Sequence, residues 1–122
     1  MATMREVLAL EETGGVDEFL GPAVESRIDR AFGGHIASQA VAAAQRTVGG
    51  KRVHSLHGYF VGPGDAKRPM ELRVERIRDG RSFAHRQVRV CQDGALIFIL
   101  MASFHREGDT GPRPVSYTHL RA

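Results

Sequence analysis

A chain of 122 residues with 42% hydrophobic and 25% charged residues has the composition of one ordinary globular domain. The formal net charge is only +3 and the basic residues are dispersed, so charge does not indicate nucleic-acid binding. The single cysteine, Cys91, excludes an internal disulfide and fits a reducing compartment. We therefore expect a cytoplasmic protein in which Cys91 is a buried structural thiol.

The sequence contains no segment typical of a signal peptide or of a membrane-spanning helix. Residues 1–10 contain no long apolar core of the kind found in signal peptides. The longest apolar run, Ala95 to Ala102, is too short to cross a bilayer. We expect no membrane partner.

The first third of the chain predicts a short strand followed by one helix. Residues 18–20 are expected to form the strand, which Gly21-Pro22 ends. A mostly small apolar stripe at helical spacing predicts a helix from His35 to Val48, and it consists of Ile36, Ala40, Val41, Ala44 and Val48. Gly33-Gly34 precedes this helix; we expect the pair to allow tight packing, with an anion site at the helix start as the alternative.

The next strand, residues 52–60, carries the most distinctive polar side chains. Strict alternation places His54 and His57 on opposite faces of a strand, so they are not expected to bind one metal ion together. His57 shares its face with Tyr59. A structural His54 hydrogen-bonded beside Tyr59 or Ser55 is favoured over a catalytic one, because no orienting partner is evident.

Three further strands are predicted as an antiparallel meander from Met70 to Phe104. Asp79-Gly80 and Asp93-Gly94 are both two-residue hairpin signals. Asp79 is therefore interpreted as a turn residue. From residue 106 the pattern dissolves into Gly, Pro, Asp and Arg, which predicts a disordered tail, and residues 115–122 have the character of a translated cloning remnant and are expected to be non-native.

These elements predict an α+β fold in one domain, residues 1–105, with a long helix packed on one antiparallel sheet. The sequence has no phosphate loop, no dinucleotide fingerprint, no zinc-ligand spacing and no nucleophile elbow. The residues alone therefore indicate a fold and leave the chemistry open.

Several separate motifs, in order and at matching spacing, resemble the acyl-CoA thioesterase II family. They are Phe32-Gly33-Gly34, Gln39-Ala40, Val53 to Phe60, Pro63-Gly64-Asp65, Arg78 to Phe83, Gln92 with Gly94, Ile97-Phe98 and Ala102-Ser103-Phe104. The resemblance runs from about residue 8 to residue 104. It implies the N-terminal member of two hotdog domains, in which a curved antiparallel sheet wraps around one long helix.

The resemblance implies hydrolysis of fatty acyl-CoA to free fatty acid and CoA, with no cofactor and no metal. It further implies that a triad of Asp, Thr or Ser, and Gln activates water and comes from the second domain. The catalytic residues of this chain are therefore left unassigned, with His54 as a weak candidate, and whether the chain alone is an enzyme stays open.

The resemblance also supplies candidates for contact with acyl-CoA or with a partner domain. Where the family has glutamine near the helix start, this chain has His35, a titratable substitute that is either a pocket residue or an exposed histidine of the first helical turn. Gln39 matches the family and is either a pocket or capping contact or a solvent-facing residue. The remaining candidates are Gly33, Gly34, His57, Tyr59, Arg81, Ser82 and Phe83, and for the last three a role in turn and sheet packing is favoured over contact with CoA or the partner domain.

Three interpretations remain. The chain is half of a two-hotdog thioesterase, or a standalone hotdog that dimerises through sheet edges, or a non-catalytic acyl-CoA-binding or assembly module. The expected partners are acyl-CoA and either a second hotdog domain or another copy of the chain.

Overall fold

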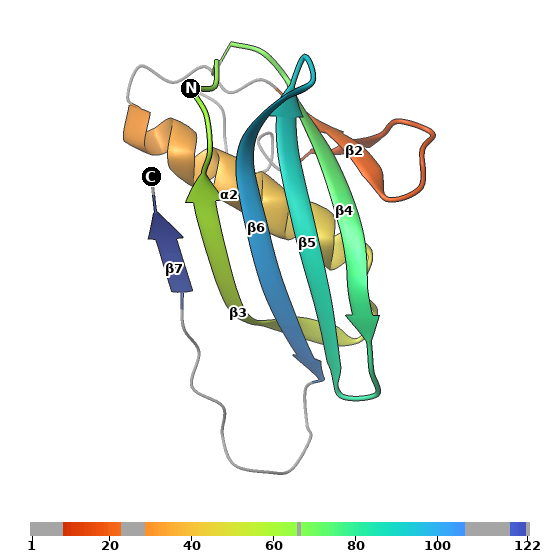
Figure 1. The fold of residues 1–122 in the computed structure, drawn as a ribbon. Helices are drawn as coiled ribbons and strands as arrows, with labels where there is room; N and C mark the ends of the chain where they lie inside the picture. The colour runs from red at the N-terminus through yellow and green to blue at the C-terminus, as the bar shows by residue number, and fades with distance from the viewer. Residues whose placement is uncertain (1–8, 23–28, 66, 107–117, 122) are drawn as a thin grey trace.

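The computed structural model describes residues 9–22, 29–65, 67–106 and 118–121. In this part of the chain, one sheet carries one long helix, α2 (Asp29–Arg46), on one of its faces (Figure 1). The strands lie in the order β1-β2-β4-β5-β6-β3-β7. Their bounds are β1 Glu11–Glu12, β2 Glu18–Gly21, β3 Lys51–Phe60, β4 Met70–Asp79, β5 Phe83–Gln92, β6 Ala95–Arg106 and β7 Thr118–Arg121. The predicted α+β class and the short strand before the helix are confirmed.

The core lies between α2 and the face of the sheet that it covers, which we call the inner face. The helix contributes mostly alanine, so its backbone approaches the sheet closely. The strands supply the larger side chains at alternate positions. The buried apolar residues of these elements are Ile36, Ala37, Ala40, Ala43 and Ala44 from α2, and Phe19, Met70, Leu72, Val74, Ala84, Val88, Val90, Ile97, Phe98, Leu100, Ala102 and Phe104 from the sheet.

The predicted meander is confirmed, because β4, β5 and β6 pair antiparallel in succession. At the second turn, Asp93 and Gly94 have φ angles of 50° and 81°. A two-residue type I′ turn requires positive φ at both positions. The two-residue hairpin turn predicted at Asp93-Gly94 is therefore confirmed.

The predicted two-residue turn at Asp79-Gly80 is wrong. Asp79 is the last residue of β4 and pairs with Ala84, and the connection runs through residues 80–82. Neither Asp79 nor Gly80 is among the described residues with positive φ. The turn is closed by a hydrogen bond of 2.7 Å from the amide of Gly80 to the carbonyl of Phe83.

Arg86 explains why Asp79 stays in the strand. Its side chain is 1% exposed on the inner face and donates to the Asp79 carboxylate at 2.6 Å. It also donates to the hydroxyl of Thr47 at 2.7 Å and to the carbonyls of Thr47, Arg78 and His85. One guanidinium thus ties the chain just after α2 to β4 and β5, and its hydrogen bond to Asp79 lowers the pKa of that carboxyl.

The helix begins earlier than predicted, at Asp29, and ends at Arg46. Gly33 and Gly34 consequently lie inside it, where backbone amides bond to carbonyls of the preceding turn. An anion site at the amides of Gly33-Gly34 is therefore wrong. Tight packing is confirmed for Gly33, because a Cβ there would lie 3.2 Å from Cζ of Phe60. A Cβ on Gly34 would meet no atom of the described residues within 4 Å.

Strand β3 contains a bulge that alters the predicted faces. Val53 pairs with Phe104 and Ser55 pairs with Ser103, which leaves His54 as the extra residue. After the bulge, Leu56 lies opposite the buried Ala102 on the inner face. The pattern of alternation is therefore interrupted at His54 itself.

Strand β7 runs parallel to β3 and pairs with Leu56–Tyr59 (Figure 1). The sequence predicts a disordered tail over this part of the chain, whereas residues 118–121 form a short strand. That the last residues are non-native stays a prediction. Residues 107–117 and 122 lie outside the described residues, as does most of the segment before β1.

Candidate functional site

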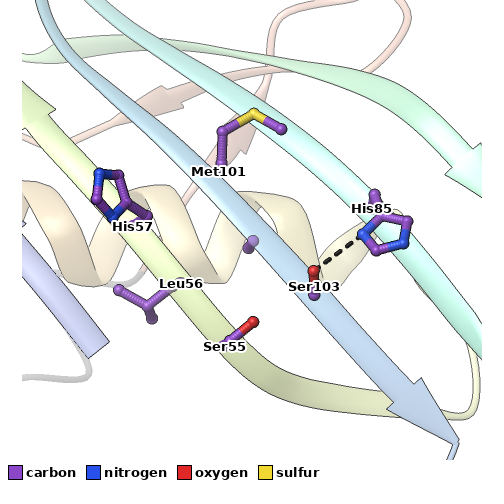
Figure 2. Close-up of a pocket in the computed structure, with 7 residues that line it drawn as sticks. Ser55, Leu56, His57, His85, Met101 and Ser103 are labelled. Atoms are coloured by element: carbon purple, nitrogen blue, oxygen red, sulfur yellow. Dashed lines mark hydrogen bonds between the residues drawn. The ribbon is translucent and has the colours of Figure 1, made fainter. Parts of the chain in front are cut away.

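A pocket of about 250 Å³ lies across β3, β6 and β5. Figure 2 shows His57, Met101, Ser103 and His85 on the face of the sheet opposite α2, which we call the outer face. The complete lining is Ser55, Leu56, His57, His85, Met101, Ala102 and Ser103. Its polar chemistry consists of two imidazoles and two hydroxyls beside a thioether.

A hydrogen bond of 2.9 Å joins Nδ1 of His85 to Oγ of Ser103 (Figure 2). The two residues are direct cross-strand neighbours. A serine bonded to a histidine is one part of a nucleophile–base arrangement, which also needs a group that orients the imidazole. Among the described residues, no carboxylate lines this pocket. The geometry is that of a cross-strand polar pair and does not amount to a catalytic triad.

His57 and Tyr59 both project from the outer face of β3, as predicted. Their ring centroids are 4.4 Å apart in an edge-to-face arrangement. His57 lines the pocket, and Tyr59, 46% exposed, lies beside it. The pair forms a partly exposed aromatic surface between the pocket and the end of β3.

The structure corrects the placement of His54. Its ring centroid lies 6.1 Å from that of Phe83 and 6.0 Å from that of His105. Phe83 and His105 are paired across the strands, on the outer face. His54 and His57 therefore lie on the same face, because the bulge redirects the side chain of His54. The predicted hydrogen bond of His54 to Tyr59 or Ser55 is also wrong, since neither ring nitrogen has a described partner although both are buried.

Arg81, Ser82 and Phe83 belong to the β4–β5 connection and the start of β5. They line a second pocket of about 230 Å³ together with Arg78, Gly80 and His85. His85 borders both pockets. The outer-face candidates are thus neighbours along one sheet surface.

The helical candidates lie on the other side of the sheet. The Gln39 side chain is 0% exposed and donates to the carbonyl of Pro22 at 3.0 Å. The solvent-facing alternative for Gln39 is therefore wrong. His35 is partly buried, and its Nδ1 is buried without a described hydrogen-bond partner.

The candidates consequently form two groups that the sheet separates. Gly33, Gly34, His35 and Gln39 lie on α2, and the histidines of β3 lie on the outer face with Arg81 and Phe83. The structure does not bring the two groups into one site. The fold of this chain therefore does not assemble a reaction centre from all of the predicted residues.

Sequence reasoning missed His85, Met101 and Ser103 as pocket residues. Alternation along β5 and β6 could have placed these side chains on one face, but only the correct pairing register of the two strands shows which of them are neighbours. Counting back from the Asp93-Gly94 turn without interruption pairs His85 with Ala102. A bulge between Val90 and Cys91 shifts the register by one residue and brings His85 opposite Ser103.

Gln92 is a further side chain whose role the sequence did not reveal. Its amide oxygen accepts from the amide of Asp65 at 2.8 Å, and its Nε2 donates to the carbonyls of Asp65 and Arg68 at 2.7 and 3.2 Å. Gln92 thereby holds the loop that follows β3 against the end of β5. The half-buried Cys91 lies next to it in the chain.

Residues 22–105 match the protein family described as acyl-CoA thioesterase N-terminal domain. The chain belongs to this family. Mouse acyl-coenzyme A thioesterase 8 is 51% identical over 78 residues, which cover 63% of this chain and 24% of the mouse protein. The present chain thus spans a minor part of this relative.

Solved structures confirm the fold. The acyl-CoA thioesterase II TesB2 from Mycobacterium marinum has a TM-score of 0.77 at 40% identity, covering 90% of this chain and 40% of that one. A hot dog fold protein from Alicyclobacillus acidocaldarius has a TM-score of 0.69 at 18% identity, covering 93% and 43%. The latter likeness concerns the fold alone, and it confirms the predicted hotdog architecture.

Within the described residues, the structure contains neither a membrane-spanning helix nor a cluster of metal ligands. No helix there is long and apolar enough to cross a membrane. No group of three or more His, Cys, Asp or Glu side chains is placed to hold a metal ion. The expectation that the reaction needs neither metal nor cofactor stays a prediction.

Proposed function

We propose that this chain is the N-terminal hotdog half of an enzyme that hydrolyses fatty acyl-CoA to free fatty acid and CoA. The family match over residues 22–105 carries the proposal. The 40% identity with the Mycobacterium marinum TesB2 chain supports it. The single cysteine of the sequence fits the cytoplasmic setting that we include in the proposal.

We place the water-activating triad of Asp, Thr or Ser, and Gln in the second domain. Two features support this division of labour. The described lining of the pocket that contains His85 and Ser103 has no carboxylate. The helical and outer-face candidates lie on opposite sides of the sheet. The chain thus provides a folded platform, and a partner supplies the groups that move protons.

The helix side is the proposed contact surface for the acyl thioester. Amides at the start of α2, near Asp29, carry the positive end of the helix dipole, which favours a carbonyl that gains negative charge. His35 follows within the first half of α2, and its buried Nδ1 has no described hydrogen-bond partner. A ligand or a partner domain that donates to or accepts from this nitrogen would satisfy it.

The proposed partner is a second hotdog domain or another copy that meets this chain at a sheet edge. Strand β7 pairs only with Leu56–Tyr59 of β3. Among the described residues, the first half of β3 therefore pairs with β6 on one edge and has no strand along its other edge. An unpaired strand edge offers backbone groups to an incoming strand.

Measurement of CoA release from palmitoyl-CoA by the purified 122-residue chain tests this proposal. We expect a folded chain with negligible turnover. Turnover that is lost in His54→Ala but kept in His57→Ala would contradict the proposal and support a standalone enzyme. Thermal stabilisation by a non-hydrolysable acyl-CoA, without turnover by the chain or by its complex with the second domain, would instead support a binding module.

A further inference from the structure

The outermost long strands of the sheet are β4 and β3, and short strands pair with only part of each. On β4, strand β2 pairs with Met70–Arg73 and with no later residue. The rest of β4 contains a bulge after Arg76 and the charged residues Glu75, Arg76, Arg78 and Asp79. Charges and bulges on an edge strand keep other strands from pairing with it. This side of the sheet is therefore protected by its own sequence.

Strand β3 is protected in the same way only along its first half. Lys51 and Arg52 lie at its start, and the bulge at His54 follows them. The second half, from Ser55 to Phe60, contains no Asp, Glu, Lys or Arg and pairs with β6 without a further bulge. A regular strand edge without charged residues readily accepts another strand. The unprotected part of the sheet edge is therefore the second half of β3.

Strand β7 lies along this unprotected half. It pairs in parallel with Leu56–Tyr59 in an unbroken register, from Thr118 opposite Leu56 to Arg121 opposite Tyr59. Figure 1 shows β7 on the side of β3 that faces away from β6. The C-terminal segment thus pairs with the backbone groups that this edge would otherwise offer to another chain.

We propose that the Leu56–Tyr59 edge of β3 is a strand-accepting surface, which residues 118–121 occupy within the chain and a second copy of the chain occupies once they are displaced. Two β3 edges related by a two-fold axis present the same backbone groups to each other, in antiparallel order. Pairing centred on Leu56–Tyr59 also places Lys51 and Arg52 of the two copies at opposite ends of the ladder, where their charges do not meet. The surface belongs to β3 and does not depend on whether residues 115–122 are native.

Tethering gives the C-terminal segment the advantage over a second copy. Residues 107–117 connect β6 to β7. A short link of this kind gives an effective concentration on the order of millimolar, well above that of a dilute protein. A dimer through this edge must also displace β7 from both copies. Release of β7 should therefore favour the dimer.

Sedimentation of the 122-residue chain and of its double variant His119→Pro/Leu120→Pro tests the proposal. Neighbouring residues of a parallel strand direct their amides to opposite sides, so one of the two prolines removes a donor to β3. We expect a monomeric wild type and a variant whose apparent dimer dissociation constant is lower by about tenfold or more. Ala122→Pro is the matched control, because it lies beyond the last paired residue, and it should sediment like the wild type.

Truncation after Arg106 is a second way to remove β7, and it should reproduce the behaviour of the double variant. Hydrogen exchange then locates the contact. In the released monomer, amides of Leu56–Tyr59 that point away from β6 should exchange faster than in the wild type, and dimerisation should protect them again. Unchanged protection of the β5 amides verifies that each variant is folded.

Met101→Lys, added to the double variant, separates an edge dimer from one formed through the outer face. Met101 is 40% exposed on that face of β6, so its replacement should leave an edge dimer intact. The proposal is overturned if both released variants stay monomeric, if the Leu56–Tyr59 amides exchange as in the wild type, or if Met101→Lys abolishes the dimer. The choice of a second copy rests on the sheet-edge partner proposed above, and because no readout here involves CoA release, a failure leaves the proposed hydrolysis to its own assay.

Discussion

At the scale of single residues, three buried polar side chains connect elements that hydrophobic contacts alone would leave loosely joined. Arg86 ties the chain after α2 to β4, Gln39 binds the carbonyl of Pro22 next to β2, and Gln92 holds the loop after β3. Each is at most 8% exposed, so loss of its hydrogen bonds would leave buried groups unsatisfied. We therefore expect substitution of these residues to destabilise the fold more than substitution of exposed charged residues.

The Asp79–Arg86 ion pair predicts a pH dependence of stability. The hydrogen bond from Arg86 lowers the pKa of Asp79 below its ordinary value of 3.8. The folded carboxyl therefore releases its proton more readily than the unfolded one, so the pair stabilises the protein above the unfolded pKa and ceases to do so as the pH falls through the lowered folded pKa. Urea unfolding of wild type and Asp79→Asn should show a difference in free energy of unfolding that disappears on acidification.

The control for this experiment is Glu75→Gln. Glu75 is exposed on β4 and forms no ion pair with a described residue. Its substitution should leave the free energy of unfolding nearly constant across the same pH range. A difference for Asp79→Asn that stays unchanged as the pH falls well below the ordinary carboxyl pKa would refute the assigned role of the ion pair.

Replacement of His54 by phenylalanine should stabilise the protein. Both ring nitrogens of His54 are buried without a described hydrogen-bond partner, while the ring packs against Phe83 and His105. Phenylalanine keeps the aromatic contacts and removes the unsatisfied groups, which is worth about 1 kcal/mol. Thermal and urea unfolding measure the effect, and a clear decrease in stability would show that a hydrogen bond to His54 exists in solution.

His57→Phe is the matched substitution on the same strand. His57 has an interaction partner and lines an open pocket. No stabilisation is expected there, because the imidazole nitrogens are not a buried, unsatisfied pair. An equal gain at both positions would mean that added hydrophobic area accounts for the effect.

At the scale of elements, the position of α2 depends on how closely it approaches β2 and the end of β3. Gly21 at the end of β2 leaves room for Gln39, and Gly33 leaves room for Phe60. The small side chains of the helix face have the same effect along its length. The distance between α2 and the sheet is therefore determined by glycine and alanine residues, whose side chains are absent or small.

Gly21→Ala should destabilise the protein by about 1–3 kcal/mol, the range for overpacking. The added Cβ would lie 2.3 Å from Oε1 of Gln39 and 3.0 Å from Cδ1 of Leu72. Both side chains are almost fully buried and have little room to move. Urea unfolding provides the measurement.

Gly34→Ala should instead stabilise the protein. A Cβ at this helical position would meet no atom of the part of the chain that the structure describes within 4 Å. Alanine in a helix is favoured over glycine by about 1 kcal/mol. If Gly34→Ala destabilised as much as Gly21→Ala, the described packing of α2 against β2 would be wrong.

Periodicity predicted the elements of this fold better than their exact connections. The stripe from Ile36 to Ala44 identified the helix, but its start was missed because Gly33-Gly34 is typical of a helix boundary and here allows contact with Phe60. The alternation in β4 and the Asp93-Gly94 turn gave the meander. The face of His54 was not predictable, because bulges have no reliable signal in a single sequence.

At the scale of the whole molecule, the chain is one hotdog whose candidate residues face two directions. The helix side contains His35 and Gln39, and the outer face contains His54, His57 and His85. The chain spans 24% of mouse acyl-coenzyme A thioesterase 8 and 40% of the TesB2 structure. The proposed hydrolysis therefore includes a second hotdog domain or another copy of the chain as partner.

The most direct test of this proposal is the rate of CoA release from palmitoyl-CoA, measured for the 122-residue chain alone and fused to the remainder of the Mycobacterium marinum TesB2 chain. We predict that the fusion hydrolyses the thioester at least about a hundredfold faster than the chain alone, the range for a positioned acid–base group. Equal rates for the folded chain and the fusion would contradict the account.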